Sequence, residues 1–239
     1  MKTLKQIINL LDKGTDFIFF ITCIILASIG SYAFYDSYML YTNATDTLIL
    51  KFKPGYDTKT EEKEEQPILD AMAGWITIDD TTIDYPIMQG ETNDTFLNID
   101  PFGNYSLSGS IFLDYRNKKN FSDPYNLIYG HHMEHNAMFG ALDQYLEKDF
   151  FETHKKGTLY INNEPHEITF FAVIETSALE PAIFSPTEND YLTLPFVLEN
   201  SLFLDQNNLP NANTDQLIAL STCKFPDNLI RTIVFGKFQ

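Results

Sequence analysis

The sequence predicts a mainly β domain, either a barrel or a sandwich, that follows an N-terminal transmembrane helix. Eight short segments between Trp75 and Phe238 have the length and the apolar pattern of strands. Before them, an uncharged run from Phe17 to Tyr35 is about as long as a helix must be to cross a bilayer. The hydrophobic content of 44% is that of a chain with a buried core, which argues against a disordered protein.

The residues on either side of the uncharged run predict its orientation in a membrane. Asp36 follows the run, and three lysines precede it: Lys2, Lys5 and Lys13. Because positive charges stay on the cytoplasmic side, we expect residues 1–16 in the cytoplasm, residues 17–35 in the membrane and the remainder outside the cell. A cleaved signal peptide is the alternative, since "LASIGS" supplies small residues near a cleavage position, but the run is longer than a usual signal core.

Residues 36–74 are predicted to form an extracellular stem. Its centre, from Asp57 to Gln66, is polar and charged, which is typical of a linker or of an exposed helix start. The following "EEQPILDAMAG" predicts a short helix, with Pro67 in its first turn and Gly74 at its end. The folded domain is therefore expected to cover residues 75–239.

The folded domain consists mostly of predicted strands. One helix is expected in residues 136–151, where Met138, Leu142 and Tyr145 fall on one helical face, and another is expected in residues 187–204. Many short strands with few helices are typical of barrels and sandwiches. The eight strand segments are WITI (75–78), IDYPIMQ (83–89), GSIFLDY (109–115), YNLIYG (125–130), GTLYI (157–161), HEITFFAVIE (166–175), DQLIALSTC (215–223) and IRTIVFGKF (230–238).

The charge of the chain excludes one class of partner. The formal net charge is −17 and the sequence pI is about 4.5. Bringing nucleic-acid phosphates to such a surface costs Coulomb energy and releases few counterions. We therefore expect no nucleic acid as a partner.

Cys223 is the only cysteine outside the predicted membrane span, which contains Cys23. Exported domains normally use cysteines in pairs as disulfides, so a single one indicates either a buried apolar residue or a thiol kept for chemistry. Cys223 follows the continuous apolar run "LIAL", which is typical of a buried strand, and it lies where that strand ends.

A catalytic thiol needs a base, because its ordinary pKa near 8.5 leaves it mostly protonated at neutral pH. The sequence has five histidines, and three of them lie in "YGHHMEH", directly after the predicted strand 125–130. Gly130 permits a sharp exit from that strand, which projects His131 from the end of the sheet. His131 is therefore the candidate base.

The two arginines of the chain are Arg116 and Arg231. Acyl transfer from a peptide builds negative charge on the carbonyl oxygen, and a guanidinium can stabilise that charge because it does not lose its proton. Arg231 begins the last predicted strand and returns beside Cys223 if the last two strands are neighbours. Arg116 lies in "DYRN", where an ion pair with Asp114 at the end of a strand is the simpler interpretation.

Several segments together resemble the sortase family. They are "LSTC" with an arginine eight residues after the cysteine, "NLIYGHHM" with a helix after it, and "WITIDDTTIDYPIMQ". The last two, with "SGSIFLDYRN", resemble class B sortases in particular, and the resemblance covers about Trp75 to Phe238. It implies a closed eight-stranded sortase-type β-barrel with a few peripheral helices, and the activity of a cysteine transpeptidase that uses no cofactor and no metal.

The resemblance also implies roles for individual residues. Cys223 would be the nucleophile, His131 the general acid and base, and Arg231 the oxyanion or substrate clamp. The substrate wall implied by the family consists of Ser221, Thr222, Asn93 and Leu97. A helix-rich insertion of class B corresponds to the segment around residues 191–204. At two positions beside the wall, 92 and 96, this sequence has Thr and Phe where the family has Asp and Tyr.

The partners implied by the resemblance are proteins and cell-wall components. The donor would be a surface protein with a Thr-containing C-terminal sorting signal of the NPxTN type. The acceptor would be the amine of a peptidoglycan precursor or of a pilin. The enzyme would be held in the cell membrane by its N-terminal helix, with the catalytic domain outside.

Two other functions remain open from the residues alone. "HHMEH" also fits H-x-x-E-H, in which His131 and His135 would bind zinc and Glu134 would act as the base of a metallopeptidase. That chemistry needs the five residues on a helix, with a third ligand downstream. The second alternative is a non-catalytic anchored surface domain in which Cys223 is only packed.

Overall fold

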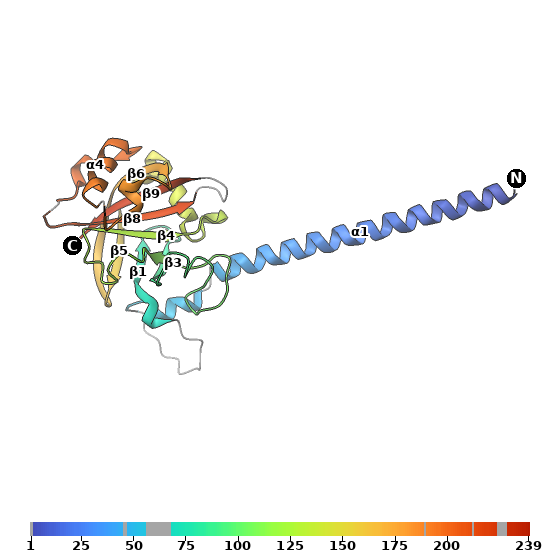
Figure 1. The fold of residues 1–239 in the computed structure, drawn as a ribbon, viewed down its shortest axis with the longest axis horizontal. Helices are drawn as coiled ribbons and strands as arrows, with labels where there is room; N and C mark the ends of the chain where they lie inside the picture. The colour runs from blue at the N-terminus through green and yellow to red at the C-terminus, as the bar shows by residue number, and fades with distance from the viewer. Residues whose placement is uncertain (1, 45–46, 56–67, 189, 212, 224–228) are drawn as a thin grey trace. The chain divides into compact units, whose positions relative to one another are not determined.

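The computed structural model describes residues 2–44, 47–55, 68–188, 190–211, 213–223 and 229–239 (Figure 1). Contacts between residues divide the chain into two units, residues 1–42 and residues 43–239. The first unit is a single helix, and the second contains all the strands. The predicted boundary between stem and folded domain at residue 75 remains a prediction.

The N-terminal helix α1 runs from Lys2 to Ala44. Its stretch from Leu11 to Met39 is long and apolar enough to cross a membrane, with a mean hydropathy of 2.2 over an 18-residue window. The predicted span, residues 17–35, lies within that stretch. Its side chains are exposed, as Phe19 and Phe34 illustrate.

A barrel of eight strands forms the centre of the second unit. Within the described residues the sheet has nine strands in the order β5-β1-β2-β3-β4-β8-β9-β6-β7, and pairing between β5 and β6 closes the ring of eight. The prediction of a mainly β fold is confirmed, and closure of the ring identifies a barrel. The strands are β1 (Met72–Ile78), β2 (Asp84–Met88), β3 (Ile111–Leu113), β4 (Tyr125–Gly130), β5 (Lys156–Ile161), β6 (Glu164–Ser177), β7 (Phe203–Leu204), β8 (Gln216–Cys223) and β9 (Ile230–Phe238).

Two parallel pairings, β2 with β3 and β4 with β8, interrupt an otherwise antiparallel ring. The pair β4–β8 joins strands that are distant in sequence, and Figure 1 shows these two strands side by side. Large apolar side chains such as Trp75, Phe170 and Phe235 are fully buried. This burial stabilises the barrel, since each such side chain contributes about 1.5–3 kcal/mol.

The predicted helix in residues 64–74 is wrong for the part of it that the structure describes. A single 3-10 turn, η2 (Leu69–Ala71), is followed at once by β1, which pairs Met72 with Met88 and Gly74 with Ile87. Gly74 does not end a helix. It lies inside a strand, where a Cβ atom would meet the backbone oxygen of Tyr160 at 2.6 Å. The close approach of β5 explains the glycine.

The predicted helix in residues 136–151 is also corrected. The segment forms a 3-10 helix, η4 (Phe139–Leu146), and a short α-helix, α2 (Lys148–Thr153). Leu142 and Tyr145 are buried as expected, but their spacing suits a 3-10 turn as well as an α-helix. Met138 has φ 49°, so the helix begins only after it.

Further short helices surround the barrel. The predicted helix in residues 187–204 is confirmed as α4 (Asp190–Asn200), while the end of that segment forms β7 and pairs with β6. Helices α3 and α4 pack on the barrel through Ile183 and Val197, which share a buried cluster with Phe171 and Phe235. The other short helices are α3 (Pro181–Phe184), η1 (Thr47–Phe52), η3 (Glu134–Asn136) and η5 (Gln206–Asn208).

Candidate active site

Strand register brings the three predicted catalytic segments together. The parallel pair β4–β8 ends with Gly130 opposite Thr222, so His131 and Cys223 follow at the same end of adjacent strands. The antiparallel pair β8–β9 places Cys223 opposite Arg231. Residues paired in this way have Cα atoms about 4.5–5.5 Å apart. The backbone alone therefore places the three positions beside one another.

A pocket of about 370 Å³ lies at this end of the barrel. It is lined by six of the seven residues that the sequence analysis named: His131, Arg231, Ser221, Thr222, Asn93 and Leu97. The seventh, Cys223, continues β8 directly after Thr222, and its side chain lies outside the described part of the structure. The pocket has further lining residues that the sequence analysis did not place there, among them Asp94, Phe112, Arg116, Tyr129 and Phe184.

The imidazole of His131 is oriented by a backbone carbonyl. Its Nε2 atom lies 2.7 Å from the carbonyl oxygen of Leu97. A carbonyl oxygen can only accept a hydrogen bond, so Nε2 must carry the hydrogen, and Nδ1 of the neutral ring is then left as an acceptor. A ring nitrogen without a hydrogen is what a general base requires. Leu97, expected as part of the substrate wall, thus also orients His131.

The loop after His131 has an unusual backbone. His135, Asn136 and Met138 have φ values of 56°, 59° and 49°, which side chains other than glycine rarely adopt. The loop is held at Met138, whose backbone N donates to Tyr85 Oη at 3.1 Å, and at His131, whose carbonyl accepts from Phe139 N at 3.0 Å. The segment is therefore not the helix that a zinc-binding H-x-x-E-H motif needs.

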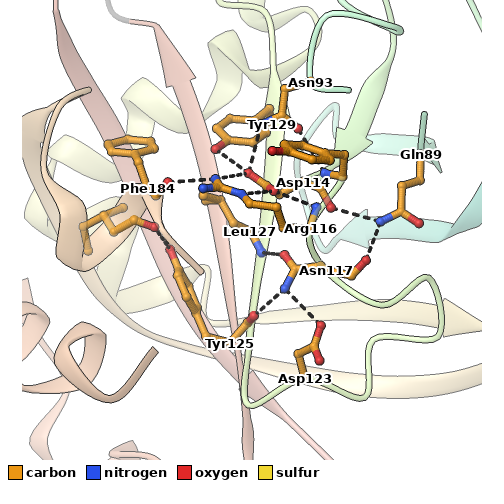
Figure 2. Close-up of polar contacts among 12 residues, drawn as sticks. Gln89, Asn93, Asp114, Arg116, Asn117, Asp123, Tyr125, Leu127, Tyr129 and Phe184 are labelled. Carbon is orange, nitrogen blue, oxygen red and sulfur yellow. Dashed lines mark hydrogen bonds and ion pairs between the residues drawn. The ribbon is translucent and has the colours of Figure 1, made fainter. Parts of the chain in front are cut away.

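A buried carboxylate, Asp114, organises the opposite wall of the pocket (Figure 2). Asp114 is fully buried. Arg116 donates to it through Nε at 2.8 Å and through its terminal nitrogen at 2.7 Å. Asn93 Nδ2 and Tyr129 Oη donate to the same carboxylate, each at 3.0 Å. The predicted ion pair in "DYRN", between Asp114 and Arg116, is confirmed. In addition, the three residues whose side chains donate to Asp114 line the pocket: Arg116, Asn93 and Tyr129.

The network also reaches the helices beyond the barrel. The guanidinium of Arg116 donates to the carbonyl of Phe184, at the end of α3, at 2.8 Å. On the other side, the side-chain oxygen of Asn93 accepts from the backbone N of Tyr115 at 3.0 Å. Figure 2 shows Asn93, Arg116 and Tyr129 converging on Asp114, and the carbonyl of Phe184 bound to the guanidinium of Arg116. One carboxylate therefore fixes this wall of the pocket.

The charges of this wall follow from its contacts. Burial alone would raise the pKa of Asp114, but hydrogen bonds from Arg116 and Asn93 and the guanidinium charge outweigh it, so that the pKa lies below its usual value. The hydrogen bond with Asp114 raises the pKa of Arg116. Burial, and then the charge of Asp114, raise the pKa of Tyr129. Asp114 and Arg116 are therefore both charged at neutral pH, and Tyr129 is a neutral donor.

Two buried hydroxyls lie on the strand that leads to Cys223. Ser221 and Thr222 are each about 1% exposed, and neither hydroxyl has a hydrogen-bond partner among the described residues. A buried polar atom without a partner costs about 1–3 kcal/mol, and a partner from outside the chain would remove that cost. Successive side chains of a strand alternate between its faces, and Thr222 is paired with Thr232, so only the Ser221 hydroxyl lies on the face of β8 that also carries Cys223.

Comparisons of the sequence with known proteins show which family the chain matches. The family model of the sortase domain matches residues 76–239. Sortase B of Listeria monocytogenes is 36% identical over 172 residues, which is 70% of this chain and 68% of that protein. Sortase B of Staphylococcus aureus is 31% identical over 169 residues, which is 70% of this chain and 69% of that protein.

Solved structures of sortases also resemble this chain. A Streptococcus pyogenes class B sortase involved in pilus biogenesis is 38% identical, with a TM-score of 0.64 over 71% of this chain and 93% of that one. A complex of Staphylococcus aureus sortase B with a substrate is 26% identical, with a TM-score of 0.65 over 83% of this chain and 93% of that one. The alternative of a non-catalytic surface domain is therefore wrong. The chain belongs to the sortase family of cysteine transpeptidases, and the relatives that it matches are class B sortases.

Proposed function

We propose that this class B sortase is anchored in the cell membrane and joins surface proteins to an amine outside the cell. The observation that carries the proposal is the register of β4, β8 and β9, which puts the positions of Cys223, His131 and Arg231 at one pocket. The proposed division of the chain is a cytoplasmic N-terminus (1–16), a membrane anchor (17–35), a stem (36–74) and a catalytic domain (75–239).

The first half of the reaction forms an acyl-enzyme. Nδ1 of His131 takes the proton of the Cys223 thiol, and the thiolate attacks the carbonyl carbon of the threonine in the sorting signal. The carbonyl oxygen becomes an oxyanion, which the guanidinium of Arg231 stabilises. His131 then gives its proton to the departing amine as the peptide bond breaks. The products are a thioester on Cys223 and the released C-terminal peptide.

The second half transfers the acyl group. The acceptor amine attacks the thioester carbonyl and loses a proton to His131, and the restored thiolate leaves and takes that proton back. A new amide bond replaces the thioester, so the energy of the cleaved peptide bond is conserved and no cofactor is consumed. The acceptor is the amine of a peptidoglycan precursor or of a pilin. The relative from Streptococcus pyogenes is itself described as involved in pilus biogenesis.

The substrate wall is proposed from the lining of the pocket. Asn93 is held in place by Asp114, and its neighbour Leu97 is 37% exposed at the pocket. On the other side, the Ser221 hydroxyl has no partner among the described residues, while Thr222 lines the pocket but turns its hydroxyl to the opposite face of β8. An extended peptide with a polar first residue and a threonine near the scissile bond suits such a wall. We therefore propose a signal of the NPxTN type.

The test is to trap the acyl-enzyme. The ectodomain is incubated with a panel of sorting-signal peptides and analysed by mass spectrometry, with Cys223→Ala as the matched control. We expect an adduct on Cys223 with the mass of the peptide up to its threonine, and neither adduct nor cleavage in Cys223→Ala. Cleavage by Cys223→Ala at the rate of the unchanged protein would refute nucleophilic catalysis by this residue.

A further inference from the structure

Asp143 on η4 contacts both catalytic segments from behind. Its Oδ2 atom lies 2.8 Å from Nε2 of His132, and its Oδ1 atom lies 3.3 Å from Oγ1 of Thr232. His132 directly follows His131, and Thr232 directly follows Arg231. Each oxygen of one carboxylate therefore contacts the neighbour of a different proposed catalytic residue.

The side chains in each pair face opposite sides. Along a strand successive side chains alternate between the two faces, so on β9 Arg231 lines the pocket while Thr232 is fully buried. His131 likewise lines the pocket, whereas the ring of His132 contacts Asp143. Asp143 therefore lies outside the pocket and contacts no residue of its lining through these two bonds.

Both contacts have a definite direction. An ionised carboxylate only accepts hydrogen bonds, so Nε2 of His132 and the hydroxyl of Thr232 are the donors. The hydroxyl of Thr232 is buried and needs an acceptor. Its cross-strand neighbour Thr222 has a hydroxyl with no such acceptor among the described residues. Asp143 on η4 therefore supplies the acceptor for Thr232 on β9, and the same carboxylate binds His132 in the loop after His131.

The His131 loop needs such an attachment. Backbone conformations of the kind found at His135 and Met138 cost about 1–3 kcal/mol each and persist only where neighbouring groups enforce them. The bonds from Met138 to Tyr85 and from Phe139 to His131 tie the loop to β2 and to itself. The contacts of Asp143, by contrast, link the loop to β9.

From these contacts we propose that Asp143 is a positioning residue of the active site. By holding His132 and Thr232 together, it fixes the distance between the imidazole of His131 and the guanidinium of Arg231. The inference rests on the proposed function of those two residues. A misplacement of about 1 Å in a catalytic group can cost on the order of a hundredfold in rate. Loss of the carboxylate therefore reduces kcat, while the peptide still binds to the intact Asp114 wall.

The test compares Asp143→Ala with Glu147→Gln, which removes a carboxylate from an exposed position four residues away. We expect kcat of peptide cleavage to fall about tenfold in Asp143→Ala with KM within about twofold, and both constants to stay unchanged in Glu147→Gln. His132→Gln should keep most of the activity, because its amide can still donate to Asp143, and His132→Ala should lose it. Thr232→Val, which is nearly isosteric, provides a variant that still folds if Asp143→Ala does not.

Amide hydrogen exchange gives an answer that does not depend on catalysis. Asp143→Ala should exchange faster at residues 131–138 and at Thr232, and Glu147→Gln should not. Unchanged kcat and unchanged exchange would overturn the inference, as would a rise in KM alone. If the unaltered protein forms no thioester, the proposed function fails, and the exchange comparison still decides whether Asp143 links the two segments.

Discussion

The polar groups that hold the two walls of the pocket differ in their exposure to solvent. On one wall, Asn93, Arg116 and Tyr129 all bind Asp114, a charged group with no exposure to solvent. Behind the other wall, outside the pocket, the segments of His131 and Arg231 meet at Asp143, whose side chain is 35% exposed and whose partner His132 is 24% exposed. The comparison suggests that the first wall gives the site its shape and the second gives it its chemistry.

The difference has an energetic consequence. Removing one partner of a buried ion pair costs about 3–5 kcal/mol, because the other charge is left in a medium that solvates it poorly. An ion pair with solvent access contributes about 0–1 kcal/mol. Substitutions in the Asp114 wall should therefore change the free energy of unfolding, whereas substitutions in the His131 wall should change the rate. The predictions below test this division.

The largest effect is expected for Asp114→Ala. The variant leaves Arg116 without its carboxylate and also removes the acceptor of Asn93 and Tyr129, so we expect the free energy of unfolding to fall by about 3–5 kcal/mol. Urea unfolding measures this. The control is Lys118→Ala, which removes an ion pair with Asp123 whose lysine is 67% exposed and should cost less than about 1 kcal/mol. Equal losses in the two variants would break the comparison.

A smaller effect, and one on rate alone, is expected for Arg231→Lys. A lysine keeps the charge but not the planar fork that a guanidinium offers to an oxyanion. We expect kcat to fall more than about tenfold, which is about 1.4 kcal/mol of transition-state stabilisation, with the unfolding midpoint in urea unchanged. A rate within about threefold of the unaltered protein would contradict the oxyanion role.

The smallest effect concerns acid unfolding. The pKa of Asp114 is lowered in the folded protein, so its contribution to stability is present above its unfolded pKa of about 3.9 and is lost as the pH falls through the folded value. Asp215, with a pKa of about 2, and Asp205 act in the same direction. The unfolding free energy should therefore decline between about pH 4 and pH 2, less steeply in Asp114→Asn. An identical slope would show that Asp114 carries no such linkage.

Much of the fold followed from local patterns. All eight predicted strands are found within a few residues of their expected bounds, because alternation of polar and apolar residues reflects a pleated, half-buried surface. The choice between barrel and sandwich did not follow from the residues themselves. It depends on the pairing of β1 with β5 and on the parallel pairing of β4 with β8, which join segments about 80–90 residues apart and have no local signal.

The two wrong helices have related causes. In residues 64–74, proline and glycine looked like the start and end of a helix, but Gly74 is required by the backbone of Tyr160 across the sheet. In residues 136–151 the apolar spacing was correct, yet it fits three residues per turn as well as 3.6. In both segments tertiary contacts decided what propensity left open.

The site was partly visible in the sequence and partly hidden. The six described residues that the sequence analysis named line a single pocket. The sequence analysis assigned Arg116 to an ion pair alone. Because the chain has only two arginines, both could have been expected near the site. The link from Asp143 to His132 and Thr232 could not be read at all, since it joins positions 11 and 89 residues apart and neither spacing matches a motif.

The pairing of β4 with β8 sets the moment at which this enzyme first becomes competent. It joins positions about ninety residues apart. Contacts between such distant positions form late in folding, because the entropy of closing a long loop is lost before the contacts stabilise the chain. Cys223 and Arg231 follow His131 in the chain by 92 and 100 residues. A nascent chain therefore contains the proposed base long before the proposed nucleophile and clamp, so the proposed site first forms in the finished barrel.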